Sequence, residues 1–470
     1  MSVFLLHRGF CSRFQRLAAA SGFALILAMF AVSASALTGS ELVAADTVIA
    51  TDSQTSASSS EAPKFVGPEF LHQQYMFNWG KERSAWAEQG FSFNFHYITD
   101  ALGDPHAPAG DVERFSNWER LRGTVDVDFG KFSSLKGLSF HATGLWQNGV
   151  NVGADIGTIA NPSAIVSSHQ FRVDSINLTQ KFLNNKVELT AGIMAAQDYY
   201  GLQTYIGSFV NEPLFYNFGN MFNARASYDP ESGPGANLKI IPNKHFFVQT
   251  GYFLPPDDGE AHVYPTGFNY KNGSHGATSD TAVGFYTDPG APSTRKAYPG
   301  SYQFGFTYNG SKAGSCNPIT GCSGFLDYST GKYVDGNYSV YFQANQSVYR
   351  VAAGSNRGLD AAFGVNTGPQ DKSKVPTEFT GGLIFRGPIA QRSKDSLALG
   401  LVYSKIGSGF NINQQRLGDP VLNNETLIEL NYKVQVAPWL VFQPVYDHYA
   451  SVGGSNHSGT IAGFRVETQF

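Results

Sequence analysis

The stretch ETLIELNYKVQVAPWLVFQPVYDHY at residues 425–449 decides the fold class of this chain. Within 427–436, alternate positions are apolar and the residues between them are mostly polar; the apolar series is Ile428, Leu430, Tyr432, Val434 and Val436. Successive side chains of a β-strand point to opposite faces, so this pattern predicts a strand with one apolar and one polar face. Ala437-Pro438 then indicates a short turn.

The same period of two recurs along most of the chain. Further segments of this kind are 124–129, 138–146, 186–193, 302–309, 338–349, 359–366, 379–386, 397–404 and 460–470. A half-buried strand of any β protein shows this alternation, so the number of segments is the signal. The last segment ends at Phe470 and resembles the closing strand of bacterial outer-membrane barrels, so Phe470 is expected to be an assembly signal.

The connections between these segments alternate between short and long. Short turns are expected at 183–186, 242–244 and 437–438, and long connections at 149–168, 254–300, 309–336 and 404–424. Long structureless loops are uncommon in soluble domains, whereas outer-membrane barrels combine short periplasmic turns with long extracellular loops. A soluble β-sandwich or propeller should instead show repeats or more even loop lengths.

The chain length sets the size of the expected barrel. About 400 residues, at roughly 25–27 residues for each strand with its share of loops, give around 16 strands and a water-filled interior. We therefore expect an all-β fold, a transmembrane antiparallel β-barrel, which must close so that every backbone group is paired in lipid. A short helix is expected before it, from Trp79 to Gln89 and ended by Gly90, because its apolar residues have helical spacing.

The N-terminus reads as a secretory signal peptide over residues 1–36. Three arginines precede an apolar run from Ala18 to Val32, and Ala34-Ser35-Ala36 provides a cleavage site after Ala36. A membrane anchor would need about 20 apolar residues, which this run does not reach. Ala44-Ala45 is an alternative cleavage point. Residues 37–74 are then expected to form a flexible linker, and residues 75–470 the outer-membrane β-barrel domain.

Composition limits the possible functions. Without residues 1–36 the chain has 30 Lys and Arg against 37 Asp and Glu, a net charge of −7, which gives no support for nucleic-acid binding. No metal-binding His pair, P-loop or nucleophile elbow is found, so we expect no enzyme, no metal and no cofactor. Cys316 and Cys322 are expected to form a small loop disulfide in the oxidising periplasm.

Several stretches together resemble the carbohydrate-selective porins, the OprB family. They are 79–97, the hairpin RVDSINLTQKF with KVELTAGI at 172–193, the segment 198–219, and the closing hairpin 425–449. The resemblance covers about 75–470 and is patchy in 255–380. It implies a 16-stranded barrel, a pore narrowed by inward segments, and uptake of sugars. One departure concerns selectivity: where the family often has R-x-x-E, this chain has Arg172-Val-Asp-Ser175. The acidic group, moved to Asp174, should face the other side of a regular strand.

The expected function is passive uptake of small carbohydrates, such as glucose, across a Gram-negative outer membrane. A sugar pore needs hydroxyl-matching polar groups and aromatic faces, whereas charged rings set ion selectivity. The candidate pore-lining residues, from the polar side of the strands, are Glu119, Arg120, Arg122, Asp126, Asp128, Arg172, Asp174 and Arg225. The same groups could instead form rim contacts or lumen salt bridges. A general or anion porin, and a plugged structural or binding barrel, stay open as alternatives.

The expected partners follow from this location. They are small sugars, outer-membrane lipid and lipopolysaccharide, and the barrel-assembly machinery, with no nucleic acid. The chain is expected to be a homotrimer or a monomer.

Overall fold

The computed structural model describes residues 74–77, 82–167, 170–203, 205, 207–256, 276–290, 294–314, 316–317 and 321–470. The predicted signal peptide with its Ala36 cleavage site, and the predicted linker up to residue 73, lie outside these residues. Within the described ranges, no helix is long and apolar enough to cross a membrane.

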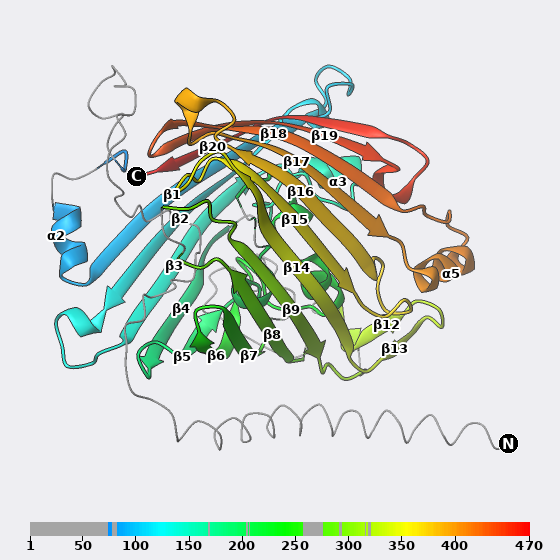
Figure 1. Ribbon diagram of the computed structural model, residues 1–470. Coiled ribbons are helices and arrows are strands. Elements are labelled where there is room, and N and C mark those ends of the chain that lie inside the picture. The colour runs from blue at the N-terminus through cyan, green and yellow to red at the C-terminus, as the bar shows by residue number, and fades with distance from the viewer. Residues whose placement is uncertain are drawn as a thin grey trace. The chain divides into compact units, whose positions relative to one another are not determined.

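Sixteen antiparallel strands form a closed barrel, in which β1 pairs with β20, so the predicted fold class and strand number are confirmed (Figure 1). The wall strands are β1 (Phe91–Gly103), β2 (Ser116–Asp128), β3 (Leu138–Gly149), β4 (Gln170–Phe182), β5 (Val187–Met194), β6 (Gly233–Asn243), β7 (Phe246–Phe253), β8 (Thr278–Thr287), β9 (Gly300–Asn309), β14 (Asn337–Arg350), β15 (Gly358–Thr367), β16 (Thr377–Arg386), β17 (Ser396–Lys405), β18 (Glu425–Ala437), β19 (Leu440–Ala450) and β20 (Gly459–Gln469).

The smaller elements lie in the connections. They are the helices α2 (Glu82–Glu88), α3 (Val152–Ile156), α4 (Gln197–Tyr200) and α5 (Ser408–Leu417), the short helical turns η2 (Val112–Arg114), η3 (Phe129–Lys131), η4 (Glu212–Leu214), η6 (Ala390–Arg392) and η7 (Val452–Gly454), the π-helix η5 (Gly219–Asn223), and the two-stranded ladders β10 (Cys316–Asn317) with β11 (Gly321–Cys322) and β12 (Phe325–Asp327) with β13 (Lys332–Val334). Figure 1 shows α2 and the C-terminus at one end of the barrel and α5 with β12–β13 at the other.

The alternation in sequence becomes an apolar outer face and a polar inner face. On β18, Ile428 and Leu430 are exposed while Glu429 and Asn431 between them are buried. On β9, Phe304 and Phe306 are exposed and Thr307 is buried. Exposed rings and aliphatic chains on so many neighbouring strands form an apolar surface far larger than a soluble monomer tolerates, and such a surface fits a lipid bilayer.

The N-terminal helix agrees with its prediction at its C-terminal end. α2 ends at Glu88, and Gly90 follows with φ +95°, a backbone conformation that glycine adopts at no steric cost. The start of the predicted helix, Trp79 to Lys81, lies outside the described residues.

One predicted connection was wrong, and one long connection was not predicted. The region 254–300 is not one connection, because it contains β8, whose sequence TSDTAVGFYT alternates small polar and apolar residues and gives a weak periodic signal. Conversely, the long connection between β5 and β6, residues 195–232, was not identified, because its many aromatic and apolar residues do not have the composition of a solvated loop.

Candidate functional site

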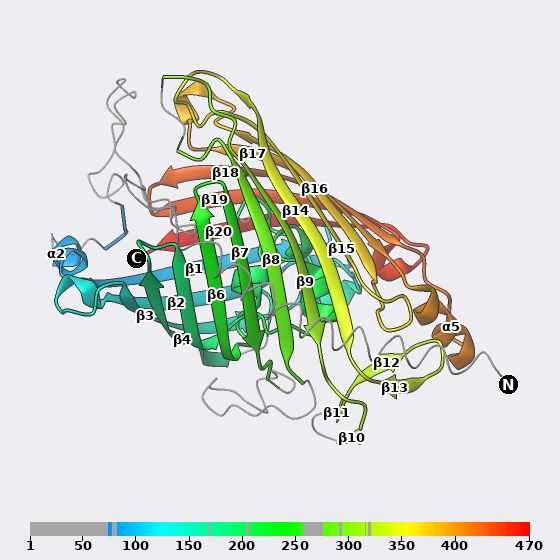
Figure 2. The same cartoon turned by 60° about the horizontal axis from the view of Figure 1, so that its bottom comes forward.

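The connection 195–232, called the inner segment below, lies inside the barrel. Near its beginning, the Tyr200 hydroxyl donates to Asn237 of β6 at 2.6 Å. Farther along, Asn431 of β18 donates to the Ser208 carbonyl at 3.0 Å. The strand order places β6 and β18 on opposite sides of the barrel, so the inner segment crosses the lumen. Figure 2 shows β6–β9 in front of β18–β20.

Apolar packing fills the lumen on one side of the crossing. Tyr205, Phe209, Val210 and Leu214 of the inner segment form one buried cluster with wall residues of β15–β20 and β1, which are Leu102, Ala362, Ile384, Ala398, Val402, Leu427, Val445, Tyr449 and Ile461. Burial of this apolar surface holds the segment against that wall. No continuous water path can pass through such a cluster, so the path must lie on another side of the lumen.

Inward-facing side chains remain accessible beside β1, β2 and β3. The exposed fraction of the side chain is 54 % for Asp126, 33 % for His141, 30 % for Arg122 and 25 % for His96. In the strand register, His96 lies directly beside Arg122, and Asp126 beside His141. This polar, accessible strip, called the open strip below, is the candidate solute pathway.

Arg122 of the open strip and its buried neighbour Arg120 pair with carboxylates. Arg120 Nη1 lies 3.0 Å from Asp229 Oδ2, and Arg122 contacts the same oxygen. Arg122 Nη2 also lies 3.9 Å from Asp174 Oδ2. Among the ion pairs of the described residues, this is the shortest one that Asp174 forms. Burial raises the pKa of Asp229, but the two guanidinium groups outweigh this effect and lower its pKa overall, so Asp229 carries its charge. Charges of both signs therefore lie close together around Arg122.

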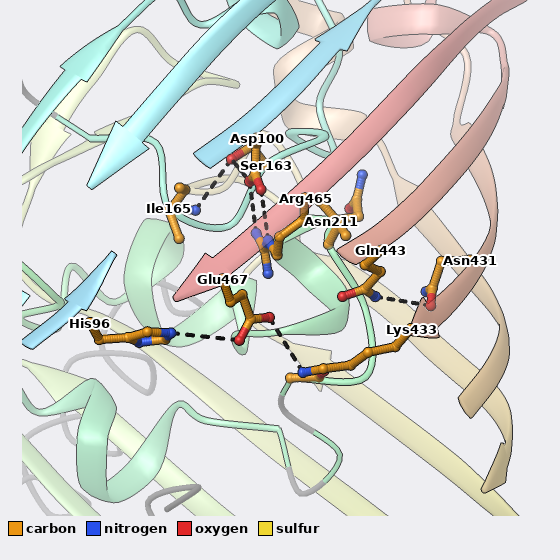
Figure 3. Close-up of polar contacts among 12 residues, drawn as sticks. His96, Asp100, Ser163, Ile165, Asn211, Asn431, Lys433, Gln443, Arg465 and Glu467 are labelled. Carbon is orange, nitrogen blue, oxygen red and sulfur yellow. Dashed lines mark hydrogen bonds and ion pairs between the residues drawn. The ribbon is translucent and has the colours of Figure 1, made fainter. Parts of the chain in front are cut away.

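A second set of charged residues lies at the seam between β20 and β1 (Figure 3). Arg465 donates two hydrogen bonds to Asp100, each 2.7 Å long, and both side chains are fully buried. Glu467 lies 3.3 Å from Lys433 Nζ and 3.6 Å from His96 Nε2. The Lys433 ammonium also donates to the Gly207 carbonyl at 3.2 Å, so the seam charges contact the inner segment.

The structure brings four of the predicted pore-lining residues together. Arg120, Arg122, Arg172 and Asp174 all face inward, and Asp126 faces inward nearby. Arg172 is only 1 % exposed, so Arg122 is better placed to meet a solute. Whether any of them contacts sugar stays a prediction.

In a regular strand, Asp174 would face the side opposite to Ser175. The structure instead places both side chains on the same side. The register between β3 and β4 shifts between Thr143 and Gly144, which leaves Asp174 as an extra residue in β4. A bulge of this kind interrupts the alternation of side chains. Asp174 and Ser175 are consequently both buried on the inner side.

Three other candidates do not line the open strip. Glu119 lies on the outer face, as Val125 does, and accepts a 2.6 Å hydrogen bond from the Tyr97 hydroxyl. Consecutive residues of a regular strand face opposite sides, so Glu119 cannot face inward together with Arg120. Asp128 caps the turn after β2 by accepting from the Gly130 amide. Arg225 belongs to the inner segment, not to a strand, and donates to the Gly324 carbonyl.

Sequence reasoning missed the seam residues and Asp229. Lys433, Arg465 and Glu467 lie on the polar side of segments that were already identified as strands, so their inward direction could have been predicted. Asp229 lies in the inner segment, and no local pattern marks it as a partner of Arg120.

The predicted disulfide residues lie in the connection between β9 and β14. Cys316 and Cys322 are opposite each other in the β10–β11 ladder, and Cys322 is disulfide-bonded.

Comparisons with known proteins agree with this architecture. The family model for the carbohydrate-selective porin, OprB family, matches residues 113–470. Porin B of Pseudomonas aeruginosa is 22 % identical over 432 residues, which are 84 % of this chain and 90 % of the relative. The high-pH structure of Pseudomonas putida OprB superposes with a TM-score of 0.74 at 18 % identity, and covers 85 % of this chain and 99 % of that one. The low-pH structure of the same protein has a TM-score of 0.52 at 16 % identity, with the same coverage.

The family match covers most of the chain, and the closed barrel with its apolar outer face agrees with it. The chain belongs to the carbohydrate-selective porin family, OprB, and it is a sugar-uptake channel of the Gram-negative outer membrane.

Proposed function

We propose that small neutral sugars, monosaccharides such as glucose, diffuse passively along the open strip beside β1, β2 and β3. The observation that carries this proposal is the position of Arg122, which is partly exposed and held between Asp174 and Asp229. A fixed guanidinium offers several donors to sugar hydroxyls. Because the surrounding carboxylates balance its charge, the lumen lacks the one-signed field of a strong ion filter.

An aromatic ring is available to the apolar face of a sugar. Phe222 in η5 is 47 % exposed, whereas the other described residues of the inner segment are buried or half-buried. Its ring packs against Phe218 with centroids 4.3 Å apart, which restricts its motion. Exposed phenylalanine is unfavourable in water, and sugar sites use aromatic side chains for the C–H faces of the ring. η5 packs against β14 and β15, across the lumen from the open strip, so we infer that Phe222 contacts the sugar at a separate point of its passage.

Liposome swelling with sugars, amino acids and anions of similar size tests the proposal. We expect glucose to enter faster than a charged solute of the same size. Arg122→Ala should weaken this preference and shift ion conductance towards cations, because Asp174 and Asp229 would then be less compensated. Arg295→Ala is the matched control, since Arg295 pairs with Asp288 in an exposed turn outside the barrel wall.

Other outcomes would point to the other functions. Equal swelling rates for glucose and the charged solute, in wild type and Arg122→Ala alike, would indicate a nonspecific porin. Preferred entry of anions would indicate an anion or organic-acid porin. A barrel that passes almost no ions across a planar bilayer would be a plugged structural or binding protein.

A further inference from the structure

Strand β18 carries two buried glutamates on its inner face, Glu425 and Glu429, four residues apart. The backbone ladder that closes the barrel already uses the amide and carbonyl groups of β18, which pair with β17 and β19. Wall closure therefore does not need these carboxylates. Their partners are instead backbone amides of connections that fold into the lumen.

Glu429 binds the tip of the inner segment. One of its oxygens accepts from the Val210 amide and the other from the Asn211 amide, both at 2.9 Å. Asn431 donates to Glu429 at 2.7 Å and, in addition, to the Ser208 carbonyl at 3.0 Å. Side chains of the wall thus bind the backbone amides of Val210 and Asn211 and the backbone carbonyl of Ser208.

Gln443 of β19 completes this attachment (Figure 3). Its side-chain amide donates to the Ser208 carbonyl at 3.3 Å and to Asn431 at 2.9 Å. Asn211 in turn donates from its side chain to the Tyr449 hydroxyl at 2.9 Å. The tip of the inner segment is consequently bound to β18 and β19, on the side of the barrel opposite to its attachment at β6.

Glu425 does the same for the connection between β3 and β4. It accepts from the amides of Ile159 at 3.0 Å, Ala160 at 2.7 Å and Gly453 at 2.6 Å. The Tyr449 hydroxyl, which accepts from Asn211, donates to the Ala160 carbonyl at 2.9 Å. Both inward-folded connections are therefore attached to one patch of wall, called the anchor patch below, formed by Glu425, Glu429 and Tyr449.

The chemistry of these contacts requires carboxylates. A carboxylate has two acceptor oxygens and can bind two neighbouring amides at once. Glutamine would place an NH₂ group against one of the amides, so a donor would face a donor in a buried site. A buried donor without an acceptor is unfavourable. Replacing the carboxylate by glutamine should therefore weaken this attachment more than the same replacement would weaken a hydrogen bond at the surface.

We propose that Glu429 is a positioning residue that sets the size limit for sugars, by holding the inner segment across the lumen, with Glu425 in the same role for residues 159–160. With the tip anchored, the apolar cluster of the inner segment keeps solute out of that side of the lumen. With the tip released, the lumen widens beside β15–β20, and larger sugars enter.

The test compares Glu429→Gln with Glu378→Gln in the full-length protein. Glu378 of β16 is equally buried on the inner face, but it accepts a 3.0 Å hydrogen bond from the Ser404 hydroxyl of the neighbouring wall strand β17. We expect the swelling rate with the trisaccharide raffinose, relative to glucose, to rise several-fold in Glu429→Gln and to stay at the wild-type value in Glu378→Gln. Single-channel conductance should rise in the same variant only.

Asn211→Pro tests the same contact from the segment side and leaves the wall intact. Asn211 has a φ of −69°, a value that proline adopts. The substitution removes the backbone N–H that donates a hydrogen bond to Glu429. It should reproduce the rise in the raffinose-to-glucose ratio. Labelling of Ser208→Cys by a membrane-impermeant thiol reagent should be slow in the wild-type background and faster together with Glu429→Gln, because Ser208 is buried while the tip is anchored.

The inference is overturned if barrels of Glu429→Gln and Asn211→Pro keep the wild-type raffinose-to-glucose ratio, or if Glu378→Gln raises it equally. The inference rests on the proposed passage of sugars, but the two can fail separately. If the wild-type protein admits no glucose, the proposed function is contradicted. If the wild-type protein admits glucose and excludes raffinose, and the variants behave in the same way, only the role of Glu429 is contradicted.

Discussion

Charged side chains inside the barrel are held in pairs, but the pairs differ in how much water reaches them. Arg465 and Asp100 are sealed from water, while Arg122 and Asp126 retain substantial exposure. A buried ion pair fixes geometry, because removal of one partner leaves a charge without compensation. A hydrated group can instead exchange its water for a solute hydroxyl. The same residue types thus stabilise the wall at the seam and, beside β2, line the proposed pathway of the solute.

Asp100→Ala should destabilise the barrel strongly. It leaves Arg465 buried without its carboxylate and removes the acceptor of the Ser163 hydroxyl, a loss of about 3–5 kcal/mol for a broken buried pair. The temperature at which the compact gel band converts to the unfolded band should fall. Asp288→Ala, which breaks an exposed pair with Arg295, should leave that temperature nearly unchanged. Equal shifts in the two variants would contradict the assignment.

Phe222→Ala should weaken sugar binding with little effect on stability. The ring is half exposed, so its removal costs little packing, but a sugar would lose an apolar contact surface. Block of ion current by glucose should require a higher sugar concentration, while conductance without sugar stays similar. Phe363→Ala is the control, because Phe363 is an exposed ring on the wall strand β15. If glucose block is unchanged in Phe222→Ala, the ring does not contact the sugar.

At the scale of elements, the two chain ends are fastened to each other at the barrel seam. The Phe470 amide donates to the Phe95 carbonyl at 2.9 Å. From α2, Arg83 donates to the carbonyls of Phe470 and Phe93, both at 2.6 Å, and the rings of Phe77 and Phe470 stack with centroids 5.9 Å apart. Phe470 therefore has a structural role in the finished barrel besides its predicted role as an assembly signal.

Deletion of Phe470 should reduce the amount of assembled barrel in the outer membrane more than it reduces the activity of the barrels that form. Arg83→Ala separates the two roles, since it removes the structural contact and keeps the terminal aromatic residue. We expect normal surface levels for Arg83→Ala with lower heat resistance, and low surface levels for the deletion, both measured by quantitative immunoblotting of membrane fractions. Normal levels of the deletion variant would show that the C-terminus is not an assembly signal.

At the scale of the whole molecule, the closed ladder dominates the behaviour of the chain. Sixteen strands without an unpaired edge leave their backbone groups satisfied in lipid, where an unpaired group costs several kcal/mol. Local changes in the lumen should therefore alter selectivity before they alter the wall. This separation makes the anchor patch and the open strip accessible to substitution.

The purified protein in detergent should give a β-rich circular dichroism spectrum. It should also migrate faster in a gel before boiling than after it, because the closed barrel stays compact until heat breaks the ladder. A spectrum dominated by helix, or recovery in the soluble periplasmic fraction, is incompatible with the structure described here.

The wall of this barrel follows from local sequence. The alternation in 302–309 and 427–436 determined both the strands and the faces that meet lipid, because a period of two is a property of neighbouring residues. β8 was missed where small residues weaken the period. The seam charges were within reach of the same reasoning, since Arg465 and Glu467 lie on the polar side of a recognised strand.

The interior depended on tertiary structure. The inner segment has no periodic signal, and its tip is hydrogen-bonded to the Glu429 carboxylate, more than two hundred residues away in the chain. The bulge in β4 that turns Asp174 inward depends on the register with β3, and the pairing of Arg120 with Asp229 depends on where the inner segment lies. Sequence alone determined a membrane barrel, because strand alternation is local; only the folded chain decided the pore, because its lining is assembled from residues that the sequence keeps far apart.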